Sequence, residues 1–155
     1  MKNAIIVSNK NSLDSLFAKV NIFTTEIELL SHWARYLCVL VNGFIEVSMR
    51  EISFDYAINS RSSKPIANFV RARIRGMQNW NMDKILITIG AFDPSLRVSV
   101  ESKLGQEEKD ALNSVANNKN KIAHGESVSM SFLQIKEYYG KVLRVIELIE
   151  STLNP

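Results

Sequence analysis

The chain has 155 residues, of which 46% are hydrophobic and 23% charged, and its formal net charge is +3. This length and composition predict one globular domain over residues 1–155 and exclude collagen-like, disordered and disulfide-scaffold proteins. Cys38 is the single cysteine, which excludes an intrachain disulfide and a cysteine-rich metal site. The longest charge-free apolar run, 36–45, is too short for a membrane helix, and no secretory signal is visible. We therefore expect a cytoplasmic protein.

Basic residues gather in a stretch, 56–82, that contains no acidic residue. The basic residues of this stretch are Arg61, Lys64, Arg71, Arg73 and Arg75. Such a patch could attract a polyanion, and Trp80 beyond it could stack on a base. The alternative is a solvated helix face whose acidic partners come from elsewhere in the fold, and composition alone favours this alternative.

The first predicted helical region covers residues 11–59 and opens with Asn11 or Ser12 as its N-cap. Apolar residues recur at helical spacing throughout this region. Because the region is long for one helix, we expect a break somewhere in 20–31. Gly43 could mark a further kink or the close approach of a second helix.

The middle of the chain contains one clear helix and two ambiguous stretches. The connection 61–65 leads to a helix with Pro65 at its first position, and Gly76 suits the end of that helix. The β-branched content of 85–89 is compatible with a buried strand or a short helix. Residues 97–101 alternate as in a strand, so local patterns leave a hairpin open here.

The last third predicts two helices. The first covers 106–124 and ends at Gly125, and the second opens with a capping-box pattern at 131–134 and runs to Asn154. Antiparallel packing of these helices would place His124 at an accessible end of the bundle.

The segment just before His124 is the one with the strongest chemical character. Two lysines and three asparagines occupy 117–121, although asparagine is a poor helix former. Asn120 and His124 are four residues apart and share a helix face, with Lys121 beside them. The negative end of the helix dipole favours a protonated imidazole, which could bind a phosphodiester and protonate a leaving oxygen. The alternative is that His124 and Gly125 simply end the helix, and spacing alone favours this alternative.

The run Lys-Asn-Lys-Ile-Ala-His-Gly at 119–125 resembles the signature of the HEPN superfamily, in which an arginine and then a polar residue precede a histidine. Segments 32–37, 43–46, 109–113 and 135–139 also resemble the RiboL-PSP-HEPN branch. The resemblance implies an all-α, HEPN-like helical bundle, which overrules the strands considered above.

The resemblance also implies an activity. Many HEPN proteins are metal-independent endoribonucleases that act as homodimers and leave a 2′,3′-cyclic phosphate, and some are effectors of defence or toxin–antitoxin systems with a cognate antitoxin. Carried over, His124 is the acid or base, Asn120 orients neighbouring groups, and Lys119 stands where the motif has arginine. RNA contacts would come from Lys121, Arg71, Arg73 and Arg75.

Lys119 is the departure from the family pattern, because lysine lacks the planar fork with which arginine grips phosphate. Arg71 or Arg75 could supply the missing guanidinium. The alternative is a catalytically silent module that acts in dimerisation or in binding a partner or RNA. Glu46 is a candidate for supporting the catalytic group, although its spacing to Arg50 favours an ordinary ion pair.

The remaining expectations concern His32, Cys38 and bound cofactors or metals. His32 beside Trp33 suggests a structural histidine, and Cys38 in its apolar run suggests a buried, inert thiol. The sequence has no glycine-rich phosphate loop, serine elbow or metal-spaced cluster, so we expect no cofactor and no metal.

Overall fold

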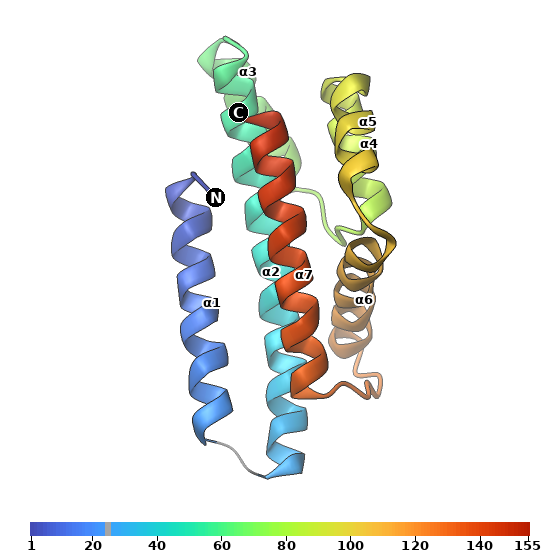
Figure 1. The fold of residues 1–155 in the computed structure, drawn as a ribbon. Coiled ribbons are helices and arrows are strands. Elements are labelled where there is room, and N and C mark those ends of the chain that lie inside the picture. The colour runs from blue at the N-terminus through green and yellow to red at the C-terminus, as the bar shows by residue number, and fades with distance from the viewer. Residues whose placement is uncertain (24–25) are drawn as a thin grey trace.

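The structure is a computed structural model that describes residues 1–23 and 26–155 (Figure 1). The described residues form helices and no strand. The helices are α1 (Ala4–Phe23), α2 (Ile27–Asn59), α3 (Lys64–Arg75), α4 (Met82–Phe92), α5 (Pro94–Lys103), α6 (Gln106–Ala123) and α7 (Phe132–Leu153). The prediction of an all-α bundle is confirmed. Over the described part of the chain, no helix combines the length and the apolar character needed to cross a membrane.

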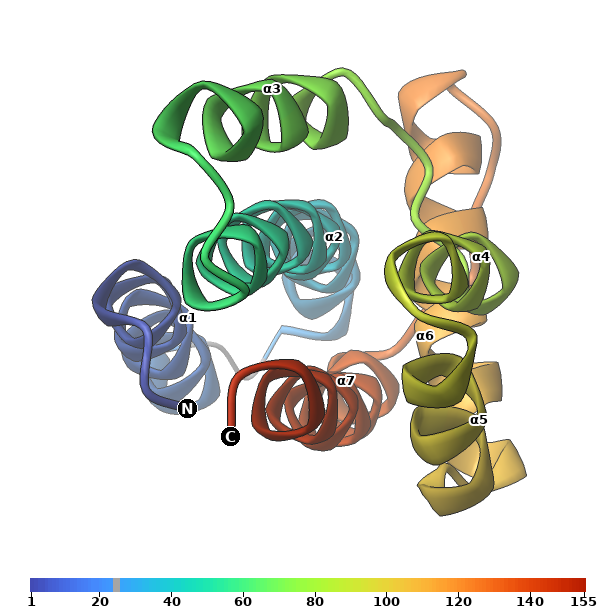
Figure 2. The same ribbon diagram turned by 90° about the horizontal axis from the view of Figure 1, so that it is seen from above.

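The long helix α2 is the centre of the bundle. It packs against α1, α3, α6 and α7, and α1, α2 and α7 run alongside one another (Figure 1). Seen from above, α2 and α7 are viewed nearly end-on, whereas α6 lies across the view beneath α4 and α5 (Figure 2). Figure 1 shows α3 beside the upper end of α2, whereas the C-terminal end of α6 lies toward the opposite, lower end of the bundle.

The N-terminal helix begins earlier than the sequence predicted. The Asn3 side chain caps α1, because its Oδ1 accepts hydrogen bonds from the backbone N–H groups of Ile5 at 2.9 Å and Ile6 at 3.1 Å. The prediction of a start at Asn11 or Ser12 is therefore wrong. The predicted break within 20–31 is confirmed, since α1 ends at 23 and α2 begins at 27, while residues 24 and 25 lie outside the described residues.

Gly43 lies inside α2, which runs through it without interruption. A Cβ built on this glycine would have no heavy atom within 4 Å. The expectation that a second helix approaches closely at Gly43 is therefore wrong.

Both ambiguous stretches are helical. In α4 the buried residues Ile85, Leu86 and Ile89 follow helical spacing, and Ile87 between them is 62% exposed. Each of these two short helices also has a side-chain cap. Asn81 Oδ1 accepts the backbone N–H of Lys84, and Asp93 Oδ1 accepts that of Ser95 at 2.7 Å. The hydrogen bonds from the side chain and backbone of Ser95 lower the pKa of the Asp93 carboxyl.

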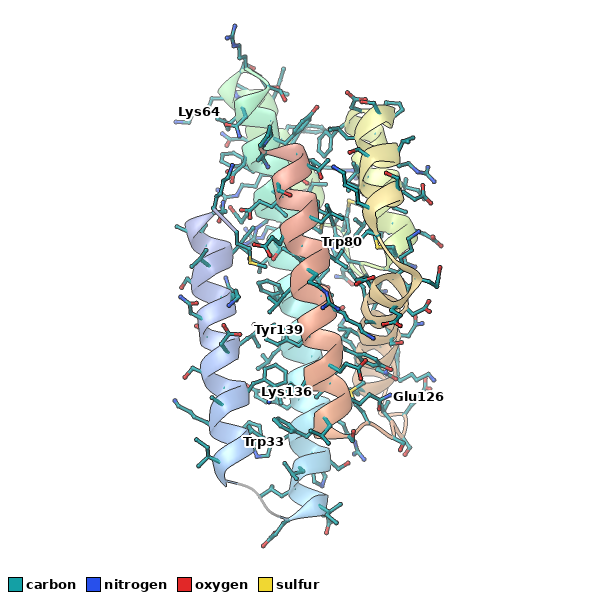
Figure 3. The ribbon with its side chains drawn as sticks, in the orientation of Figure 1. Trp33, Lys64, Trp80, Glu126, Lys136 and Tyr139 are labelled. Carbon is teal, nitrogen blue, oxygen red and sulfur yellow. The ribbon has the colours of Figure 1, made fainter. Side chains whose placement is uncertain are left out.

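The core draws buried side chains from all seven described helices. The rings of Phe17 and Tyr139 stack with centroids 4.8 Å apart, and Tyr139 Oη donates to Asp14 Oδ1 at 2.8 Å (Figure 3). Cys38 is fully buried and its thiol donates to the carbonyl of Val115 at 3.6 Å. Burial raises the pKa of Cys38 to about 12, so the thiolate is disfavoured at neutral pH. The predicted burial of Cys38 is confirmed.

Candidate functional site

The end of α6 is fixed by a hydrogen-bonded backbone motif. His124 is the C-cap, and Gly125 follows with a φ of 73°, in the left-handed region. The Gly125 N–H donates to the carbonyl of Ile122 at 3.1 Å, and the Glu126 N–H donates to that of Lys121 at 2.9 Å. This pair of bonds is the Schellman motif, which closes a helix in one defined geometry. The backbone of His124 is therefore held rigidly, and the predicted end of the helix is confirmed.

The predicted catalytic residues all lie in the last two turns of α6 and at its C-cap. His124 and Lys121 are exposed, and Lys119 and Asn120 are half-buried. Among the described residues, no side chain forms a hydrogen bond with the His124 imidazole. The imidazole is thus open to a ligand, which is the accessible position that the sequence predicted.

A neighbouring loop, 77–81, positions the Lys119 ammonium. Lys119 Nζ donates to Asn79 Oδ1 at 3.5 Å, and Asn79 has a φ of 56° in the left-handed region that asparagine tolerates. The chain is anchored directly after this contact. Trp80 is fully buried, and the Met82 N–H donates to Asn113 Oδ1 at 2.8 Å. The prediction that Trp80 stacks on a base is wrong, because its ring belongs to the core (Figure 3).

Sequence reasoning missed Asn79 as a partner of Lys119. The two residues are 40 positions apart, and only the fold brings them together. The available local signal was weak: an asparagine beside a tryptophan in a short connection, where a left-handed residue reverses the chain.

The predicted RNA contact Arg71 is engaged by a buried carboxylate. Glu51 of α2 is 2% exposed, and Arg71 Nη2 donates to its Oε1 at 3.0 Å and its Oε2 at 2.9 Å. The Arg71 guanidinium also lies 4.8 Å from the centroid of the Phe54 ring. The alternative in which acidic partners come from elsewhere in the fold is therefore confirmed for Arg71. The structure holds Arg71 at Glu51 and does not bring it to α6.

The expected pair between Glu46 and Arg50 is wrong. Glu46 Oε1 accepts from Asn42 Nδ2 at 3.0 Å, whereas Arg50 Nε donates to Glu51 Oε1 at 2.8 Å. The reason is burial, since a carboxylate as enclosed as that of Glu51 requires charged partners. His32 is exposed on α2, and its expected structural role stays a prediction.

One further arginine, Arg35, lies on α2, the helix that packs against α6. Arg35 is one turn before Cys38 on α2, and Cys38 contacts the backbone of α6 at Val115. The Nε atom of Arg35 is buried and has no hydrogen-bond partner among the described residues. Arg35 is therefore a better candidate than Arg71 for a guanidinium beside the helix that carries Lys119.

The candidate site is thus an exposed histidine at the end of a helix, preceded by amide and ammonium groups, in an all-α bundle. Within residues 1–23 and 26–155, no group of three or more His, Cys, Asp or Glu side chains could hold a metal ion.

The sequence matches the RiboL-PSP-HEPN family over residues 5–155, and the chain belongs to this family. No curated protein and no solved structure matches the chain.

Proposed function

We propose that this protein is a metal-independent endoribonuclease with His124 as its acid or base. The observation that carries the proposal is the exposed His124 imidazole, fixed at the end of α6 within the family motif and preceded by Lys119 and Asn120. Membership of the RiboL-PSP-HEPN family also supports a nuclease or RNA-related role.

In the proposed reaction the ribose 2′-oxygen attacks the adjacent phosphorus. The new bond joins O2′ to phosphorus, and the bond from phosphorus to O5′ breaks. The His124 imidazolium gives its proton to the leaving O5′, and the 2′-hydroxyl proton passes to water or to the neutral imidazole of a second subunit. The Lys119 ammonium stabilises the charge that develops on the phosphoryl oxygens, and Asn120 orients the phosphate. The products end in a 2′,3′-cyclic phosphate and a 5′-hydroxyl.

We also propose that the active form is a homodimer. An apolar groove of about 530 Å³ lies beside the start of α7, and two of its lining residues, Ile27 and Leu133, are 85% and 73% exposed. The groove begins at Ser129, within the connection that leaves His124 (Figure 3 shows Glu126 of this connection). A second copy seated here would bring two histidine motifs to one interface. We further propose that the protein is a cytoplasmic effector of a defence or toxin–antitoxin system. A cognate antitoxin would then cover this groove.

A second candidate function is a catalytically silent module that dimerises or binds a partner or RNA. The observation that favours it is Lys119 itself, which replaces the forked guanidinium of the motif and already donates to Asn79. Such a module tolerates His124→Ala without losing its partner, whereas a nuclease loses its activity.

The test compares the two histidines of the chain. End-labelled single-stranded and structured RNAs are incubated in EDTA with the wild-type protein, His124→Ala and the matched control His32→Ala. Both histidines are exposed, so both changes should leave the fold intact. We expect cleavage by the wild type and His32→Ala, and a loss of roughly 10²–10⁴-fold in His124→Ala. If the wild type leaves every RNA intact, with and without added metal, the silent module is the better account.

A further inference from the structure

The helices α2 and α3 enclose a basic hollow that is separate from His124. The hollow has a volume of about 530 Å³ and is lined by Arg50, Asn68, Arg71, Ala72 and Arg75. We call this group of residues the arginine pocket. No acidic residue lines it, although Glu51 lies directly behind two of its arginines.

Glu51 fixes the orientation of these two arginines. It accepts from Arg50 Nε and from Arg71 Nη2, and it is almost fully buried. Phe54 supports the Arg71 guanidinium from one face. The side chains of Arg50 and Arg71 are 26% and 40% exposed, so their remaining N–H groups face the open hollow rather than the core. Among the described residues these remaining N–H groups have no hydrogen-bond partner.

The charge of the pocket is unbalanced. Three guanidinium groups meet one carboxylate, and the chain from 56 to 82 supplies no further acidic residue. Arg71 and Arg75 are one helical turn apart, a spacing at which like charges repel. Arg75 forms no ion pair within the described residues. A bound anion would relieve this repulsion and satisfy the free N–H groups.

The geometry suits one class of anion. Planar guanidinium groups grip phosphate through parallel hydrogen bonds, and Asn68 adds an amide donor one turn before Arg71. Arg73 does not belong to the pocket, because it is two residues from both Arg71 and Arg75 and points away from their shared face.

We propose that the arginine pocket is a phosphate-binding site in which Arg50, Arg71 and Arg75 hold the phosphoryl oxygens and Glu51 acts as the positioning residue. Phosphate binding at this site does not depend on whether His124 cleaves RNA. The phosphate belongs either to the backbone of a bound RNA or to a terminal phosphate.

The experiment follows the arginine Nε–Hε signals by NMR in the His124→Ala protein, which separates binding from cleavage. The probes are inorganic phosphate, sodium chloride at equal ionic strength, and a short single-stranded RNA with or without a 5′-phosphate. We expect phosphate to shift the signals of Arg50, Arg71 and Arg75 with saturation, and chloride to leave them unchanged. An RNA that requires its 5′-phosphate identifies a terminal phosphate, and equal binding of both RNAs identifies a backbone phosphate.

Three substitutions on α3 test whether the side chains of the arginine pocket bind the phosphate. Arg75→Gln should raise the phosphate Kd about tenfold or more, as expected for one charged hydrogen bond. Arg75→Lys should raise it several-fold, because the charge remains and the fork is lost. The matched control Arg73→Gln removes the same charge outside the pocket and should change the Kd less than twofold. Equal effects of Arg73→Gln and Arg75→Gln, or no saturable phosphate binding, would overturn the proposal.

Discussion

The two glycines of the α6–α7 unit provide a sharp test, because one chemical change should have opposite effects at the two positions. A Cβ added at Gly125 or at Gly140 would meet no heavy atom within 4 Å. Steric clash with neighbours is therefore absent at both. The difference is the backbone, since Gly125 has a φ of 73° and Gly140 lies inside the regular helix α7.

The magnitudes follow from these conformations. A non-glycine residue in the left-handed region costs roughly 1–2 kcal/mol, so Gly125→Ala should lower the free energy of unfolding by about 1 kcal/mol or more after the smaller entropy of the unfolded chain is included. In a helix interior, alanine is better than glycine by about 0.5–1 kcal/mol. Gly140→Ala should therefore raise the free energy of unfolding by that amount.

The assay is urea unfolding of the wild type and both variants, monitored by circular dichroism at one pH. We expect the midpoint of Gly125→Ala to fall and that of Gly140→Ala to rise, with unchanged m-values. A Gly125→Ala protein as stable as the wild type would refute the assigned helix end, because the left-handed residue would then be absent or located elsewhere.

Three further predictions concern other residues. Cys38, whose pKa burial raises to about 12, should resist alkylation in the native protein at pH 8 and react at once in denaturant; fast native modification would contradict its burial. Burial and then the hydrogen bond to Asp14 raise the pKa of Tyr139, so its phenol stays neutral in the fold and ionises on unfolding above about pH 10. The free energy of unfolding should therefore fall above that pH by up to about 1.4 kcal/mol per pH unit. Tyr139→Phe should be about 1 kcal/mol less stable than the wild type at neutral pH, and its stability should fall less steeply at alkaline pH. An unchanged alkaline slope in this variant would exclude Tyr139 as the source of the decline. Lys119→Arg restores the arginine of the family motif and should raise the rate of RNA cleavage by roughly tenfold. This gain corresponds to about 1.4 kcal/mol of added stabilisation of the transition state. A slower variant would indicate that the contact to Asn79 requires lysine.

The helix ends that the sequence predicted correctly depend on local chemistry. Gly125 adopts its left-handed φ directly after the C-cap of α6, and Ser131 Oγ accepts the Gln134 N–H at 3.1 Å as the capping pattern predicts. The start of α1 was missed because Asn3 and Asn11 are equally good caps in isolation. The fold selects Asn3, whose backbone N–H also donates to the buried carboxylate of Glu150 at 2.8 Å.

The candidate site likewise contains contacts that local sequence predicts and contacts that only the fold creates. His124 and its neighbours lie within one helix end, so their proximity follows from sequence spacing alone. The partners of Arg71 and Lys119 come from α2 and from the 77–81 loop, and no local pattern records these contacts. Trp80 was misjudged for the same reason, because only the packed structure shows that its ring is fully buried.

Attack by a ribose 2′-hydroxyl with the assistance of His124 is tested most directly by comparing two RNA substrates. An RNA that the wild type cleaves at a defined bond is compared, in EDTA, with the same RNA carrying a single 2′-deoxy nucleotide 5′ to that bond, and the product ends are identified by mass spectrometry. We predict a 2′,3′-cyclic phosphate and a 5′-hydroxyl from the all-ribose RNA, no cleavage at the deoxy position, and no products from His124→Ala. Cleavage that persists at the deoxy position, or in the His124→Ala protein, would contradict the proposed mechanism.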